Sequence, residues 1–136
     1  MATQLAPYIF FYGRCEEALE FYKGVFGGSY EIMRVSDTPV ASEMPPGSGN
    51  SVMHASFKGD EISFMCSDGQ QGKAVDPDAG NISLALSFDD AARGETIFNG
   101  LAAGATIGMP ISAAFWGGRF GMATDKFGTE WMVTLP

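Results

Sequence analysis

Two stretches of the chain repeat apolar side chains at the three- and four-residue spacing of an amphipathic helix. The first is about Glu16–Phe26 and ends before a pair of glycines. The second is about Ala91–Ala103, which follows two possible N-cap residues, Asp89 and Asp90, and precedes Gly104. Because Asp favours the N-cap and Gly the C-terminal end, we expect one covering helix in each half of the chain.

Alternating and apolar strand patterns fill most of the remaining sequence. One strand is expected before each helix, at 7–12 and at 81–88. In 81–88 large residues from Ile82 to Phe88 alternate with Ser and Ala, so we expect the large side chains to pack on the helix and the small ones to leave room on the other face. Three strands are expected after each helix, at 30–35, 52–57 and 62–66, and at 106–111, 119–124 and 131–135.

The order of elements is therefore βαβββ, repeated once. Residues 20–28 align with 96–104, with Gly24 on Gly100 and Gly28 on Gly104. We expect an α+β fold in which two βαβββ modules, about 1–68 and 81–136, form curved mixed sheets around a cleft within a single domain, 1–136. The linker at 67–80 allows the modules to pair within one chain or between two chains.

The loop at 36–50 contains three prolines, two glycines and three serines. Such a segment beside a cleft is typical of a mobile flap, and a plain surface loop has the same composition. Both interpretations stay open from the sequence.

Composition and charge narrow the class of protein. The chain has 136 residues and a formal net charge of −8, which argues against binding nucleic acid and suits a pocket for cationic ligands. The spacing of Cys15 and Cys66 matches neither a metal site nor a redox pair, so we expect two free thiols in a reducing compartment. The N-terminus lacks the charged region of a signal peptide and its apolar run is too short to span a bilayer, so we expect a cytoplasmic protein without a membrane partner.

Three segments resemble a known family: "PYIFFYGRCEEALEFYKGVFG", "MHASFKGDEISFMCSD" and "FWGGRFGMATDKFGTEWMV". They resemble the PhnB-like group of the vicinal-oxygen-chelate superfamily, which includes glyoxalase I, extradiol dioxygenases and bleomycin-binding proteins. The resemblance covers essentially the whole chain, and it implies the glyoxalase/bleomycin-resistance-type fold and a homodimer. Related sequences often carry the name of a ubiquinone-pathway methyltransferase, but this chain has no glycine-rich strand-to-helix loop for a nucleotide-like cofactor.

The resemblance also implies where a divalent metal would be held by His, Gln and Glu side chains. The matching positions here are Pro7, Met65, Asn81 and Met132. Proline has no ligating side chain, and a thioether suits neither Mg²⁺ nor Mn²⁺. We therefore predict no metal site and no cofactor.

His54 is the single histidine of the chain. It is a candidate general base or lone ligand in the cleft, and the alternative is a hydrogen-bonded strand histidine that supports a neighbouring turn. Around it we predict an apolar small-molecule pocket with a few polar groups, against the alternative of a closed core. The predicted ligand-binding residues are Tyr8, Phe10, His54, Met65, Asn81, Ser83, Trp116, Arg119 and Met132.

The C-terminal segment combines a turn with exposed aromatic residues. Asp125 is expected to start a turn in which Gly128 has a positive φ. By the two-residue period, Trp131, Val133 and Leu135 should face a helix and Met132 the cleft.

Two further features of the segment have two interpretations each. Phe115 and Trp116 are expected to form an aromatic rim of the cleft or to meet a partner subunit. Arg119 would stabilise an anionic ligand or would pair with Asp125 or Glu130.

The sequence thus favours a metal-independent small-molecule-binding protein that forms a homodimer. The alternatives are a glyoxalase-like lyase or dioxygenase with a rearranged metal site, and a drug-sequestering resistance protein whose acidity attracts a basic drug. The identity of the ligand does not follow from the sequence.

Overall fold

A computed structural model of the chain describes residues 3, 5–70, 73–76 and 80–136. Its internal contacts divide it into two units, Met1–Val75 and Asp76–Pro136, and each is described by itself. Parts of the predicted linker, 71–72 and 77–79, lie outside the described residues. That the two units form a single domain stays a prediction.

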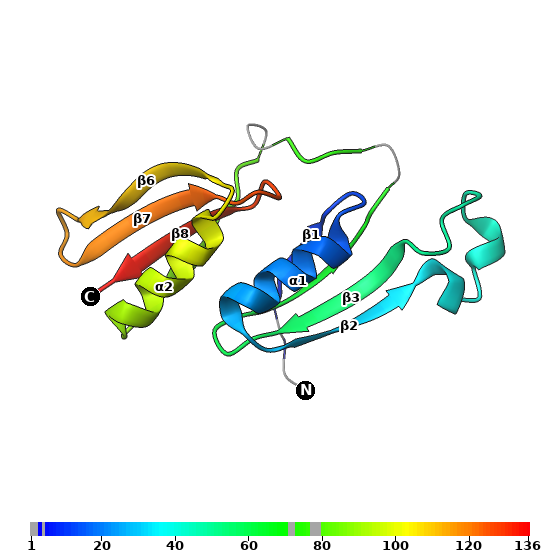
Figure 1. Cartoon of the computed structure of the whole chain (residues 1–136), viewed down its shortest axis with the longest axis horizontal. Coiled ribbons are helices and arrows are strands. Elements are labelled where there is room, and N and C mark those ends of the chain that lie inside the picture. The colour runs from blue at the N-terminus through cyan, green and yellow to red at the C-terminus, as the bar shows by residue number, and fades with distance from the viewer. Residues whose placement is uncertain (1–2, 4, 71–72, 77–79) are drawn as a thin grey trace. The chain divides into compact units, whose positions relative to one another are not determined.

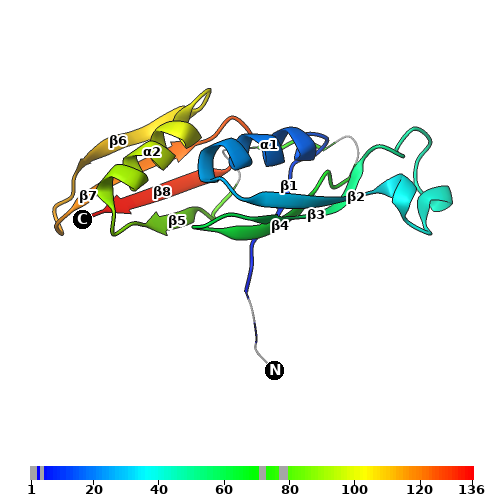
Figure 2. The same cartoon turned by 60° about the horizontal axis from the view of Figure 1, so that its bottom comes forward.

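The first unit is a four-stranded mixed sheet with one helix on one of its faces (Figures 1 and 2). The strand order is β1-β4-β3-β2, where β1 runs parallel to β4 and the other neighbours are antiparallel. Helix α1 buries Tyr22 and Phe26 completely, with the Tyr22 ring edge-on to Phe64 at 5.5 Å between centroids. The elements are β1 (Tyr8–Phe10), α1 (Cys15–Phe26), β2 (Ser29–Arg34), β3 (Val52–Lys58) and β4 (Ser63–Ser67).

The second unit repeats this topology with the order β5-β8-β7-β6. Strand β5 is parallel to β8, and α2 packs on the face that carries Val133 and Leu135, beside Phe98. The predicted α+β class and the βαβββ repeat are therefore confirmed, as is the inward face of the last strand. The elements are β5 (Leu84–Ser87), α2 (Ala91–Ala102), β6 (Thr106–Ala113), β7 (Arg119–Thr124) and β8 (Glu130–Leu135).

The helix ends and the last turn follow the sequence closely. The Asp90 carboxylate accepts a hydrogen bond from the Arg93 backbone N–H at 3.2 Å, so Asp90 is the N-cap of α2. The aligned Gly28 and Gly104 both have positive φ, 90° and 72°. Gly128 has φ 90°, which confirms the predicted turn conformation.

The strand expected at 81–88 is shorter than predicted. Strand β5 begins at Leu84, because the pairing with β8 begins at Leu84 opposite Trp131. Ile82 therefore lies outside the sheet with 81% of its surface exposed, and it does not pack on the helix as predicted. The prediction failed because the alternation continues beyond the point where a partner strand is present.

The loop between β2 and β3 contains two short 3-10 helices, η1 (Val35–Asp37) and η2 (Ala41–Glu43). Its two ends are joined by backbone hydrogen bonds, from Val35 N–H to Ser51 O at 2.9 Å and from Ser36 N–H to Gly49 O at 3.0 Å. The loop therefore leaves and returns to the sheet at one place. That it moves as a flap stays a prediction.

Candidate functional site

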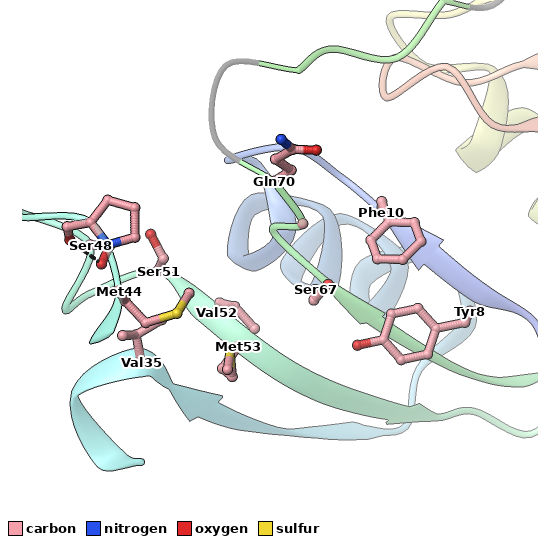
Figure 3. A pocket seen from close by; sticks show the side chains of 12 residues that line it. Tyr8, Phe10, Val35, Met44, Ser48, Ser51, Val52, Met53, Ser67 and Gln70 are labelled. Atoms are coloured by element: carbon pink, nitrogen blue, oxygen red, sulfur yellow. Dashed lines mark hydrogen bonds between the residues drawn. The ribbon is translucent and has the colours of Figure 1, made fainter. Parts of the chain in front are cut away.

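A pocket of about 480 Å³ lies in the first unit, on the open face of its sheet. Figure 3 shows Tyr8 and Phe10 on one side, Met44 and Ser48 on the other, and Ser67 between them. Its walls come from β1, from the β2–β3 loop, from the start of β3 and from the end of β4. The described lining residues are Tyr8, Phe10, Val35, Met44, Pro45, Ser48, Ser51, Val52, Met53, Ser67, Gly69 and Gln70.

The aromatic wall follows from the two-residue period of β1. Tyr8 and Phe10 share one face with ring centroids 5.2 Å apart, and they are 40% and 48% exposed. Phe11 lies on the opposite side and is buried beside Tyr22. Tyr8 and Phe10 thus share one face of β1, and both rings are accessible from the pocket.

His54 lies on β3 and has a hydrogen-bonding partner from β1. The Tyr8 hydroxyl and His54 Nδ1 are 3.1 Å apart, and which of them donates depends on the imidazole tautomer. Strand β4 lies between β1 and β3, so the Tyr8 side chain reaches across it. His54 is thus a hydrogen-bonded strand histidine whose partner is a pocket residue, and its role as a general base or lone ligand stays a prediction.

The end of the pocket at β3 and β4 is fixed by a carboxylate. Asp68 accepts the Cys15 N–H at 2.9 Å and the Val52 N–H at 2.7 Å, and its own N–H donates to Val52 O at 3.0 Å. One side chain thus joins the first turn of α1 to two strands. Val52 and Ser67, which line the pocket beside it, are 3% and 4% exposed.

Behind this wall the two thiols of the chain meet. Cys15 Sγ and Cys66 Sγ are 3.4 Å apart and fully buried. The hydrogen bond with Cys66 and burial raise the pKa of the Cys15 thiol, which keeps it protonated. The spacing of 51 residues gave no sign of this contact, because α1 and β4 approach each other only in the folded sheet.

The predicted residues of the second unit lie in several places. Asn81 is exposed outside the sheet, and the Ser83 hydroxyl donates to Glu130 Oε1. Trp116 is 58% exposed on the turn between β6 and β7, against Phe120 at 5.6 Å between ring centroids. The structure thus gathers Tyr8, Phe10, His54 and Met65 in the first unit, whereas the other predicted residues belong to the second unit.

The partner predicted for Arg119 was wrong. Its guanidinium pairs with Glu95 on α2, and not with Asp125 or Glu130. Asp125 is engaged elsewhere: its carboxylate accepts from Phe127 N–H at 2.9 Å, Thr129 N–H at 3.1 Å and Trp131 Nε1–H at 2.8 Å. Its turn-forming role is confirmed.

Met132 belongs to a row of methionines across the open face of the second sheet. Met109 on β6 is opposite Met122 on β7, and Met122 is opposite Met132 on β8, with Ala85 of β5 next in the row. Met65 occupies the corresponding position in the first sheet, opposite Tyr8. Unbranched thioether side chains adapt readily to differently shaped neighbours.

The four positions that the resemblance matched to metal ligands do not fit a hard divalent ion. The Pro7 carbonyl accepts the Met65 N–H at 3.0 Å, Asn81 stands alone on the surface, and Met65 and Met132 present thioethers. Over residues 3, 5–70, 73–76 and 80–136, no three His, Cys, Asp or Glu side chains are grouped to hold a metal ion. Within the same residues, no helix is long and apolar enough to cross a membrane.

Sequence reasoning missed most of the pocket. Met44, Pro45 and Ser48 come from the β2–β3 loop, and Ser51, Val52 and Met53 from its return to the sheet. The available signal was the apolar pair Met44-Pro45 in a loop rich in serine, glycine and proline. An apolar pair in such a loop indicates contact with an apolar surface.

Comparison with known proteins places the chain in a family. The family profile described as "3-demethylubiquinone-9 3-methyltransferase" matches residues 3–134. Protein YjdN of Escherichia coli (strain K12) is 30% identical, over 96% of this chain and 94% of that protein.

Solved structures agree in fold. Protein PA1353 from Pseudomonas aeruginosa has a TM-score of 0.83 and 33% identity, with 98% of each chain covered. The putative 3-demethylubiquinone-9 3-methyltransferase, PhnB protein, from Bacillus cereus has a TM-score of 0.76 and 28% identity, with 98% of this chain and 100% of that chain covered. A glyoxalase-related enzyme from Fulvimarina pelagi shares the fold, with a TM-score of 0.64 and 19% identity over 99% of this chain and 89% of that chain. The chain therefore belongs to the family of this profile, the PhnB-like group, and it has the fold of a glyoxalase-related enzyme.

Proposed function

We propose that the protein binds a small molecule in the pocket of its first unit, without a metal ion. The observation that carries this proposal is the pocket of about 480 Å³ between the Tyr8–Phe10 wall and the β2–β3 loop. Small-molecule sites are of this size, mostly apolar, with a few polar groups that orient the ligand. Here the polar groups are Ser hydroxyls, the Gln70 amide and the Tyr8 hydroxyl.

The chemistry of the pocket supports the two alternative functions less well. A lyase or dioxygenase would need a rearranged metal site, and a sequestering protein would need negative charge at the ligand. None of the described lining residues is charged, although the whole chain carries −8. A methyl transfer is not proposed either, because β1 passes into α1 through residues 11–14 with a single glycine, Gly13.

The test is binding of an uncharged fluorophore, N-phenyl-1-naphthylamine, to chelator-treated protein. We expect saturable binding that Phe10→Ala weakens about tenfold, because less apolar surface is buried around the probe. The matched control is Ile107→Ala, which shortens an apolar side chain of β6 that is 49% exposed and is not among the predicted contacts. Equal weakening by both variants, or binding that requires added Zn²⁺, Ni²⁺ or Mn²⁺, would contradict the proposal.

The remaining predicted contacts are part of the proposal and are tested in the same assay. They are Met65, Asn81, Ser83, Trp116, Arg119 and Met132. A residue whose alanine variant binds the probe with unchanged affinity would not belong to the site. The salt dependence of binding distinguishes a drug-sequestering protein from the proposed function, since attraction of a basic drug by net charge weakens as ionic strength rises.

We also propose a homodimer in the cytoplasm. Phe115 and Trp116 pack edge-on at 4.8 Å and remain 96% and 58% exposed within the chain. Aromatic rings left at a surface are usually covered by a ligand or a partner. Light scattering should give twice the chain mass for the wild type. A monomer at micromolar concentration would refute the dimer. A dimer that persists in Trp116→Ala would show that Trp116 is not part of the interface.

A further inference from the structure

We propose that the pocket selects a flat, uncharged ligand that carries one hydroxyl or carbonyl oxygen, and that Tyr8, held by His54, recognises this oxygen. The inference rests on the proposed function and names the ligand class for the same site. It depends on three features: the charge of the lining, the shape of the aromatic wall, and the hydrogen bond between Tyr8 and His54.

The lining disfavours charged ligands of either sign. Its described residues are apolar, aromatic, hydroxyl or amide, with neither a carboxylate nor a cation among them. The carboxylate of Asp68, which lies between the lining residues Ser67 and Gly69 in the chain, is already bonded to the Cys15 and Val52 N–H groups. A charged group that loses water without a partner of opposite sign pays a large desolvation cost, so an uncharged ligand is favoured.

The aromatic wall favours a flat ligand. The rings of Tyr8 and Phe10 stand side by side, and the Phe10 ring is stacked with Tyr12 at 6.1 Å between centroids. Gly69 allows this arrangement, since a Cβ there would lie 3.1 Å from the Phe10 and Tyr12 rings. Offset or edge-on contact with such a wall is open to another ring.

The hydrogen bond with His54 makes the Tyr8 hydroxyl adaptable. When Tyr8 donates to His54 Nδ1, its oxygen can accept from a ligand hydroxyl. When the neutral imidazole carries its proton on Nδ1 and donates to Tyr8, the tyrosine O–H can donate to a ligand carbonyl. A hydroxyl and a carbonyl therefore both fit, and His54 acts as a positioning residue.

The experiment compares naphthalene, 2-naphthol, 2-naphthoate and 2-naphthylmethylammonium as competitors of N-phenyl-1-naphthylamine. We expect 2-naphthol to bind about three- to tenfold more tightly than naphthalene, the usual gain from one hydrogen bond, and both ions to bind more weakly than 2-naphthol. Tyr8→Phe should bring the ratio of 2-naphthol affinity to naphthalene affinity to about one and leave the affinity for naphthalene unchanged. The matched control is Tyr30→Phe, since the Tyr30 hydroxyl donates to Glu20 on α1 and is absent from the lining.

His54 is tested by the same affinity ratio, which a general loss of stability would not change selectively. His54→Ala should lower the ratio, and His54→Asn should keep it, because an amide atom can occupy the place of Nδ1. A ratio that survives Tyr8→Phe, or tighter binding of either ion, would overturn the inference while the small-molecule site stands. Failure of the wild type to bind any of these compounds would instead overturn the proposed function.

Discussion

The two units share one topology but differ in the connection between their second and third strands. Residues 35–51 join β2 to β3, whereas residues 114–118 join β6 to β7 in a short turn with Gly117 and Gly118 at positive φ. The long connection contributes Val35, Met44, Pro45, Ser48 and Ser51 to the pocket. The comparison teaches that the repeated sheet supplies an open face, and that the loop makes one of these faces a pocket.

A second difference lies in the place where an aspartate joins parts of each unit. In the first unit, Asp68 links α1 to β3 from the end of β4. In the second, Asp125 fixes the β7–β8 turn and the indole of Trp131. The following substitutions test further features of the two units, from the largest expected effect to the smallest.

The aligned glycines after the two helices should differ most. A Cβ on Gly28 would lie 2.0 Å from the Lys58 carbonyl oxygen, whereas a Cβ on Gly104 meets nothing nearer than Lys126 Cδ at 3.6 Å. Both have positive φ, so both alanine variants are strained, but Gly28→Ala must also move the backbone. In urea denaturation, we expect the free energy of unfolding to fall by about 4 kcal/mol for Gly28→Ala and by about 1 kcal/mol for Gly104→Ala. Equal losses would show that the β3–β4 turn adjusts freely.

The aspartates of the two β-turns should differ next. Asp125 is 4% exposed and accepts three hydrogen bonds, whereas Asp60 lies on the surface of the β3–β4 turn. Asp125→Ala leaves the Trp131 indole N–H and two backbone donors without this acceptor, and should cost about 3 kcal/mol. Asp60→Ala should remain within about 0.5 kcal/mol. A small effect of Asp125→Ala on the thermal midpoint would contradict this account of the turn.

The helices also differ at the aligned pair Ala18 and Gly94. The alignment that places Gly24 on Gly100 places Ala18 on Gly94, where a Cβ would lie 2.1 Å from Leu135 Cδ2 and 3.0 Å from the Phe88 ring. Gly94→Ala should therefore cost about 2 kcal/mol by overpacking, and Ala18→Gly about 1 kcal/mol by loss of helix propensity. If Gly94→Ala is stabilising, α2 has room to move away from β8.

The smallest effect concerns pH. The Tyr30 hydroxyl donates to Glu20 Oε1 at 2.7 Å, and this bond raises the pKa of Tyr30 to about 12. Wild type should therefore lose stability more steeply than Tyr30→Phe as the pH rises from about 10 to about 12, by a few tenths of a kcal/mol because the pair is exposed. Parallel pH profiles of the two proteins would contradict the assignment.

The sequence was sufficient for the elements and their order, because periodicity and turn residues are local signals. Asp90 and Gly128 are examples, since each acts on its own turn. It was insufficient where a contact depends on how elements pack. The pairing of Arg119 with Glu95 depends on the rotation of α2 over the sheet, and the start of β5 depends on where β8 provides a partner residue.

The candidate site illustrates the same limit. Tyr8 and Phe10 were among the predicted ligand-binding residues, and both line the pocket because side chains two residues apart share one face of a strand. The contact between Tyr8 and His54 joins β1 to β3, 46 residues apart, and the loop residue Met44 joins the site through a turn. Neither follows from periodicity, because neither is fixed within one element.

The separation of cysteine and tryptophan between the units provides two intrinsic reporters of unfolding. Both thiols, Cys15 and Cys66, are buried in the first unit, and both indoles, Trp116 and Trp131, belong to the second. Alkylation of the thiols therefore measures the opening of one unit, while indole fluorescence measures the loss of structure in the other. Coincident transitions would indicate that the two units unfold as one cooperative body, and separate transitions would assign each unit its own free energy.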